Sequence, residues 1–124
     1  MAEDPAGQFV ACPWGGYTVL QSTEAFKVKT IEVAPGHRLS YQRHRQRSER
    51  WIIVEGTGLV TLAGGTSKVT PGDSVEIAVG SLHRIANSGD VPLVFVEVQQ
   101  GSYFGEDDIE RIEDDYSRAQ EIVK

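Results

Sequence analysis

Short apolar runs alternate with polar residues along most of the chain, and turn residues separate the runs at close intervals. Side chains two residues apart point to the same face of a strand, so this alternation predicts half-buried β-strands. Many short strands with frequent turns favour an all-β barrel or sandwich. The predicted strands are Tyr17–Leu20, Phe26–Val33, Leu39–His44, Trp51–Glu55, Leu59–Leu62, Ser67–Val69, Ser74–Ile77, His83–Asn87 and Leu93–Gln99.

Two places along the chain depart from plain alternation. Gly64-Gly65, between two strand-like runs, predicts a tight hairpin. After Gly105, Ile109, Ile112, Tyr116 and Ala119 recur at helical spacing, which predicts a partly helical C-terminal segment. A chain of 124 residues suffices for one core. We therefore expect a flexible arm over residues 1–11, one β-domain over 12–118 and a tail over 119–124.

The charge of the chain is acidic overall but unevenly distributed. Twelve basic residues face 18 acidic ones, a net charge of −6, which argues against nucleic acid or an anionic membrane as a partner. Five arginines nevertheless fall between Arg38 and Arg50, whereas acid concentrates between Gly105 and Asp115. The basic stretch suits a small anionic ligand.

Cysteine content and terminal pattern bear on location. The one cysteine, Cys12, excludes an internal disulfide and fits a reducing compartment. The first residues show no signal-peptide pattern, and no apolar run reaches membrane-spanning length. We expect a soluble, cytoplasmic protein.

Two spaced motifs carry the candidate chemistry. The first runs from Gly36 to Gly56, and the second from Gly72 to Asn87. Within the first, Gln42 and His44 share a strand face, and Glu49 lies on the same face as Trp51 and Ile53 after a four-residue corner. His83 of the second motif must come from a distant strand, which a barrel allows. Two imidazoles, one carboxylate and one amide oxygen suit a divalent ion such as Mn, Fe, Co, Ni or Zn.

These motifs resemble the two signature motifs of the cupin superfamily, small β-barrels that hold a metal. Over residues 12–118 the chain is similar to one branch, the type II mannose-6-phosphate isomerase domain, which often forms the C-terminal part of bifunctional mannose-1-phosphate guanylyltransferases. The stretches that carry this resemblance are Pro13-Trp14-Gly15, Phe26–Lys29, Arg38–Ser40, Glu49-x-Trp51, Gly80–Arg84, Glu97–Gln99, Gly101–Ile109 and Glu113–Tyr116.

The resemblance implies a single-domain cupin that interconverts mannose 6-phosphate and fructose 6-phosphate at a divalent metal held by Gln42, His44, Glu49 and His83. The family tends to carry glutamine at the position of Gln42. It commonly carries histidines where this chain has Arg45, Gln46 and Arg50, and usually arginine where it has Cys12. These departures bear on which sugar is bound. No Gly-rich phosphate loop is present, so we expect no guanylyltransferase activity.

An isomerase also needs a base and a phosphate site. Strand parity offers Glu97 as the base, with pairing to a neighbouring arginine as its structural alternative. Arg38, which parity points inward, is the first candidate for binding phosphate. Arg84 and Lys29 are further candidates, although alternation turns Arg84 away from His83.

Other functions remain open on the same residues. Two histidines and a carboxylate also describe a non-haem metal oxygenase, and a cupin can bind a sugar phosphate without turning it over. A homodimer is expected on general grounds.

Overall fold

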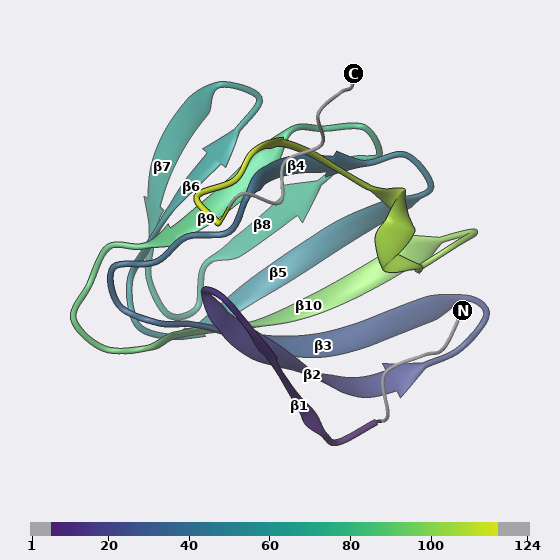
Figure 1. Ribbon diagram of the computed structural model, residues 1–124, viewed down its shortest axis with the longest axis horizontal. Coiled ribbons are helices and arrows are strands. Elements are labelled where there is room, and N and C mark those ends of the chain that lie inside the picture. The colour runs from purple at the N-terminus through teal and green to yellow at the C-terminus, as the bar shows by residue number, and fades with distance from the viewer. Residues whose placement is uncertain (1–5, 117–124) are drawn as a thin grey trace.

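Two facing antiparallel sheets make up the protein (Figure 1). The computed structural model describes residues 6–116. The elements are β1 (Phe9–Cys12), β2 (Gly15–Ser22), β3 (Phe26–Val33), β4 (Tyr41–His44), β5 (Arg47–Glu55), β6 (Gly58–Leu62), β7 (Gly65–Val69), β8 (Ser74–Ile77), β9 (His83–Asn87), β10 (Leu93–Gly101), the 3₁₀ turn η1 (Glu106–Asp108) and β11 (Ile109–Glu113). One sheet has the order β1-β2-β3-β10-β5-β8, and the other β11-β4-β9-β6-β7. The all-β prediction is confirmed, and every predicted strand overlaps an observed one.

The hydrophobic core lies between the two sheets at one end. Inward positions of β3, β5 and β10 alternate with outward ones, as the sequence pattern predicts. Val33, Ile53 and Phe95 are each at most 1% exposed. Ile85 of β9 closes the core from the other sheet. Burial of these side chains fixes the strand register, because a one-residue slip would move every apolar side chain to solvent.

The same inward rows become polar at the other end of the large sheet. Glu97 of β10 pairs in register with Lys29 of β3 on one side and with Trp51 of β5 on the other. Gln99 likewise lies between Lys27 and Glu49. All of these side chains except Trp51 are polar, and all are buried. Buried charge is costly unless it is paired. The cluster of buried polar residues therefore marks this end of the barrel as the candidate functional site.

Several local predictions are corrected by the structure. The last three residues of the expected flexible arm over residues 1–11 belong to β1 (Phe9–Cys12), which pairs with β2. The hairpin turn is Ala63-Gly64, one residue earlier than predicted, because Gly65 already pairs with Leu62. Residues 1–5 lie outside the described part of the chain.

The C-terminal helix predicted from the spacing of Ile109, Ile112 and Tyr116 is wrong over the described residues. Ile109–Glu113 forms β11, which pairs with the outer edge of β4. Helical structure there is limited to the three residues of η1, and Ala119 and later positions lie outside the description. Among residues 6–116 no helix is long and apolar enough to span a membrane.

Gly56 and Gly36 offer a matched test of the barrel turns. Both have a positive φ, +85° and +80°, but a Cβ on Gly56 would lie 2.5 Å from the Pro92 carbonyl oxygen, whereas one on Gly36 meets nothing within 4 Å. We expect Gly36→Ala to lower the free energy of unfolding by about 1 kcal/mol, from the backbone conformation. Gly56→Ala should cost about 3 kcal/mol or more, because the overlap adds to that term. Denaturant unfolding of both variants measures the difference, and equal losses would contradict the close approach to Pro92.

Candidate metal centre and adjoining cavity

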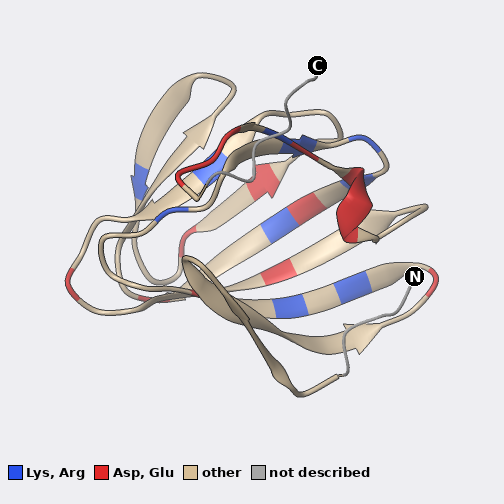
Figure 2. Cartoon of the chain, in the orientation of Figure 1, with Lys and Arg blue, Asp and Glu red and all other residues tan. Residues whose placement is uncertain are grey.

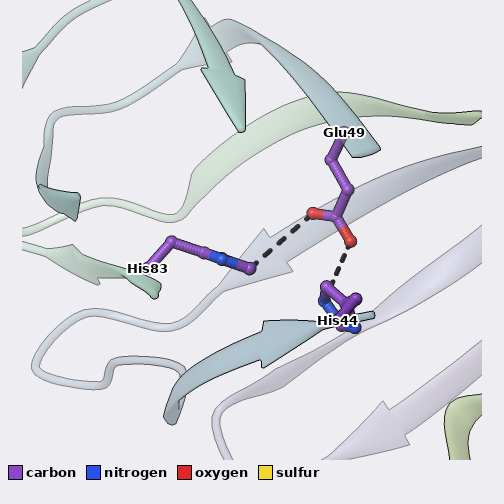
Figure 3. A group of neighbouring side chains, drawn as sticks. All are labelled: His44, Glu49 and His83. Carbon is purple, nitrogen blue, oxygen red and sulfur yellow. Dashed lines mark ion pairs between the residues drawn. The ribbon is translucent and has the colours of Figure 1, made fainter. Parts of the chain in front are cut away.

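Three buried side chains from three strands converge at the polar end of the barrel (Figure 3). His44 ends β4, Glu49 lies in β5 and His83 begins β9. His44 Nε2 is 3.1 Å from Glu49 Oε2, and His83 Nε2 is 3.9 Å from Glu49 Oε1. The potential ligand atoms all lie within 4.8 Å of one another. The two sheets thus bring together three residues that the sequence places up to 39 positions apart.

The hydrogen bonding of His83 fits a metal site. His83 Nδ1 lies 2.8 Å from the Ser81 carbonyl oxygen, which can only accept, so Nδ1 carries the proton and Nε2 keeps its lone pair. This Nε2 is buried and has no hydrogen-bond partner. Burial lowers the pKa of His83, which favours the neutral ring that binds metal. A carbonyl that orients a ligating imidazole in this way is typical of metal centres.

Gln42, the fourth predicted ligand, lies at the edge of this group. It pairs with His83 in the β4–β9 ladder. Its Nε2 is 3.4 Å from His44 Nε2, and its Oε1 accepts a hydrogen bond from Ser40 Oγ. The amide oxygen would therefore have to turn from Ser40 to reach an ion. The donor set of two ring nitrogens, one carboxylate and a nearby amide fits a divalent cation.

Glu49 is embedded in a network of donors. Arg47 Nε donates to Glu49 Oε2 at 3.0 Å, and Arg47 Nη2 lies 2.9 Å from the same oxygen as an ion pair. Trp51 Nε1 donates to Glu49 Oε1 and also lies 3.2 Å from Glu97 Oε2. Gln99 Nε2 donates to Glu97 Oε1 at 3.0 Å. Every member of the network is buried, so the residues fix one another's positions.

The two carboxyl groups of this network differ in protonation. Burial raises the pKa of Glu97 well above its usual value, and repulsion from the nearby Glu49 charge adds to the effect. Burial would raise the pKa of Glu49 as well. Hydrogen bonds from Glu97 and His44 and the attraction of Arg47 outweigh it and hold that pKa well below its usual value. Without a bound ion, these two directions favour a protonated Glu97 beside a charged Glu49.

A cavity of about 70 Å³ adjoins the network. Among the residues lining it are Lys29, Gln42, Arg47, Glu97 and Glu106. The Lys29 side chain is 5% exposed, and its Nζ lies 3.2 Å from Glu106 Oε2 and 4.2 Å from the centroid of the Tyr17 ring. The cationic Lys29, the carboxyl group of Glu97 and the candidate metal ligand Gln42 thus all line one cavity.

The two predicted phosphate-binding arginines do not line this cavity. Arg38 was expected to point inward, but its side chain is 44% exposed and donates two hydrogen bonds to Asp115. Arg84 is buried and does turn away from His83, as alternation predicts. Its guanidinium binds the Leu39 carbonyl and Glu113. Of the three cations predicted, Lys29 is the one placed at the cavity.

Sequence reasoning missed Arg47 and Glu106. β5 begins at Arg47, four residues before the predicted strand, and the corner after His44 is the two residues Arg45-Gln46. Arg47 lies two positions before Glu49, so the same parity that placed Glu49 inward could have found it. Glu106 comes from a distant segment, and no local pattern points it at Lys29.

Comparison with known proteins identifies the family. Residues 3–114 match the family described as mannose-6-phosphate isomerase C-terminal. The chain belongs to this family. It is 50% identical over 109 residues to the alginate biosynthesis protein AlgA of Pseudomonas aeruginosa, covering 88% of this chain and 23% of AlgA. It is 42% identical over 106 residues to the mannose-1-phosphate guanylyltransferase ManC of Salmonella typhimurium, covering 86% of this chain and 22% of ManC.

The cupin fold is shown as well. The capsular polysaccharide assembling protein CapF of Staphylococcus aureus matches with a TM-score of 0.73 and 20% identity, over 86% of this chain and 34% of CapF. A cupin domain of Schizosaccharomyces pombe Cnp3 matches with a TM-score of 0.67 and 16% identity, over 69% of this chain and 64% of that domain. The chain spans less than a quarter of the length of the curated relatives described above.

Proposed function

We propose that this member of the mannose-6-phosphate isomerase C-terminal family is a metal-dependent aldose–ketose isomerase that interconverts mannose 6-phosphate and fructose 6-phosphate. The observation that carries the proposal is that the cavity lined by Lys29 and Glu97 adjoins the His44–Glu49–His83 group. Two other lining residues, Gln42 and Arg47, contact His44 and Glu49 of that group. A cation for phosphate, a carboxyl group for proton transfer and a ligand set for a metal are the three parts that such a reaction needs.

The reaction moves one proton between neighbouring carbons, and a second proton from the hydroxyl oxygen on one of them to the carbonyl oxygen on the other. His44, Glu49 and His83, with Gln42, would hold a divalent ion, which when bound supplies polarisation of the sugar carbonyl. Glu97, whose ionised form the charge of a bound cation would favour, would take the proton from the carbon next to the carbonyl and return it to the former carbonyl carbon. Trp51 and Gln99 orient the Glu97 carboxyl group through hydrogen bonds to its two oxygens. The buried surroundings exclude water, so the proton stays with the carboxyl group between the two transfers.

Assay of the isomerase reaction tests the proposal. Metal-stripped protein is re-supplied separately with Mn, Co, Ni, Zn and Fe, and fructose 6-phosphate formed from mannose 6-phosphate is followed in a coupled assay. We expect turnover with at least one metal and none in a His44→Ala variant.

Absence of turnover with every metal, despite metal uptake, would overturn the isomerase assignment. Binding of the sugar phosphate without turnover would then indicate a non-catalytic sugar-binding cupin. Oxygen uptake by the iron-loaded protein would indicate an oxygenase instead.

A further inference from the structure

Two buried cations share one partly exposed carboxylate at the mouth of the cavity. The side chains of Lys29 and Arg47 are 5% and 3% exposed, whereas that of Glu106 is 41% exposed. Glu106 Oε2 lies 3.2 Å from Lys29 Nζ and 3.7 Å from Arg47 Nη1. Burial would raise the pKa of Glu106, but the attraction of Lys29 and Arg47 outweighs it and holds that pKa below its usual value. Glu106 is therefore charged at neutral pH and neutralises cations that cannot reach solvent.

The segment that carries Glu106 is fastened to the barrel rim by other acids. Asp108 accepts hydrogen bonds from the backbone N–H groups of Arg45 and Gln46 at 3.0–3.2 Å. Glu110 pairs with Arg43 and Arg45 at 2.9 and 3.0 Å. Figure 2 shows η1 in red and both red and blue residues along β11, which pairs with the strand β4 that carries Arg43. Within η1, Glu106 is the residue that lines the cavity.

Size and charge both indicate that Glu106 stands where a ligand would bind. The cavity of about 70 Å³ is well below the roughly 300–1,000 Å³ of ordinary ligand pockets. Glu106 is one of its partly exposed lining residues, so its departure would widen the cavity opening. That departure would also take away the carboxylate that lies 3.2 Å from Lys29 Nζ and 3.7 Å from Arg47 Nη1. A phosphate monoester dianion supplies the missing charge and several strong acceptors in one group.

We propose that Lys29 and Arg47 form an anion site for the phosphate group of the substrate, and that the Glu106 carboxylate occupies this site as an internal competitor until the ligand displaces it. The substrate class rests on the proposed isomerase function, whereas the anion site itself does not. η1 thus acts as a lid: the Glu106 carboxylate leaves the anion site when a phosphate group binds there.

Phosphate binding to Glu106→Gln tests the exchange. Inorganic phosphate and mannose 6-phosphate are titrated calorimetrically into wild type, Glu106→Gln and Glu32→Gln at constant ionic strength. Loss of the competitor should tighten phosphate binding by about tenfold, equivalent to about 1.4 kcal/mol. Glu32→Gln removes the same charge on the exposed face of β3, away from the η1–β11 segment, and should leave affinity within about twofold of wild type. Lys29→Met should weaken binding and cancel the gain from Glu106→Gln when the two are combined.

Unchanged or weaker phosphate binding in Glu106→Gln would overturn the proposal, as would an equal gain in Glu32→Gln, which indicates a general charge effect. Should Glu106→Gln fail to fold, the wild-type chain supplies a second readout. The amide signals of Arg45 and Gln46, which donate to Asp108, should shift on phosphate addition as η1 leaves. Unshifted signals at saturating phosphate overturn the lid. If Glu106→Gln binds phosphate more tightly but the protein shows no turnover, the isomerase assignment is wrong and the anion site stands. If the protein turns over mannose 6-phosphate but Glu106→Gln does not bind phosphate more tightly, the lid is wrong and the isomerase assignment stands.

Discussion

His83→Ala is expected to abolish metal uptake. His83 presents Nε2 to Glu49 while its Nδ1 is held by the Ser81 carbonyl, so the substitution removes a pre-oriented ligand. Changing a residue that merely supports a ligand already costs roughly 10–100-fold in affinity, and loss of the ligand itself should cost at least about 100-fold. Titration of metal-stripped protein with each candidate ion measures the effect.

Stability provides a second readout of the same variant. An ion present at 100 times its dissociation constant should stabilise the wild type by about 2.7 kcal/mol, and this increment should vanish in His83→Ala. The matched control is His37→Ala, because His37 stacks on Tyr116 with ring centroids 5.9 Å apart and lies outside the metal centre. The control should keep both uptake and the increment. Uptake of one ion per chain by His83→Ala with unchanged affinity would refute the assigned ligand set.

The candidate ligands were predictable because sheet geometry preserves alternation. Within β4 and β5, positions two apart stay on one face, so Gln42 with His44, and Glu49 with Trp51, follow from the sequence. Glu97 follows in the same way, since β10 alternates without interruption up to the polar end of the sheet. Burial of the apolar residues further along these strands fixes the register and hence the polar positions.

Strand alternation predicts side-chain direction wrongly where the backbone is not in a strand. Arg38 precedes β4 by three residues and is joined to the sheet by an isolated bridge to Ala86. The alternation that holds from Tyr41 onward therefore does not extend back to it, and its side chain points to solvent and to Asp115. Its inward orientation was an extrapolation across irregular backbone.

The C-terminal segment shows a competition that periodicity cannot resolve. Ile109 and Ile112 fit a helical spacing, yet β4 is a short strand joined to β9 by one register pair, Gln42 with His83. Its other edge has backbone groups that β11 satisfies. Ile109 is consequently buried whereas Ile112 is 46% exposed. Pairing with β4 therefore makes this segment a strand rather than a helix. The same pairing places its acidic residues, which the sequence suggests are solvated, next to the basic residues between Arg38 and Arg50.

Glu97→Gln is expected to lower kcat for the proposed isomerisation by about 100- to 10,000-fold, the usual contribution of a positioned acid–base group. Metal uptake should persist, because Glu97 is not one of the His44–Glu49–His83 ligands. The raised pKa of Glu97, caused first by burial, means that the residue donates its proton toward Glu49, and the glutamine amide can replace that donor. Coupled assays and metal titration on the same preparation measure both quantities.

Stability must be measured beside activity in this variant. The two Glu97 oxygens accept from Trp51 and Gln99, and a glutamine offers one oxygen, so a donor left without an acceptor could cost about 1–3 kcal/mol. Glu32→Gln, on the exposed face of β3, removes a charge without touching the site and should behave as wild type. Full turnover by Glu97→Gln would place the base elsewhere. Loss of turnover with metal uptake and sugar-phosphate binding intact would assign proton transfer to Glu97, because a positional defect of the metal centre would weaken uptake as well.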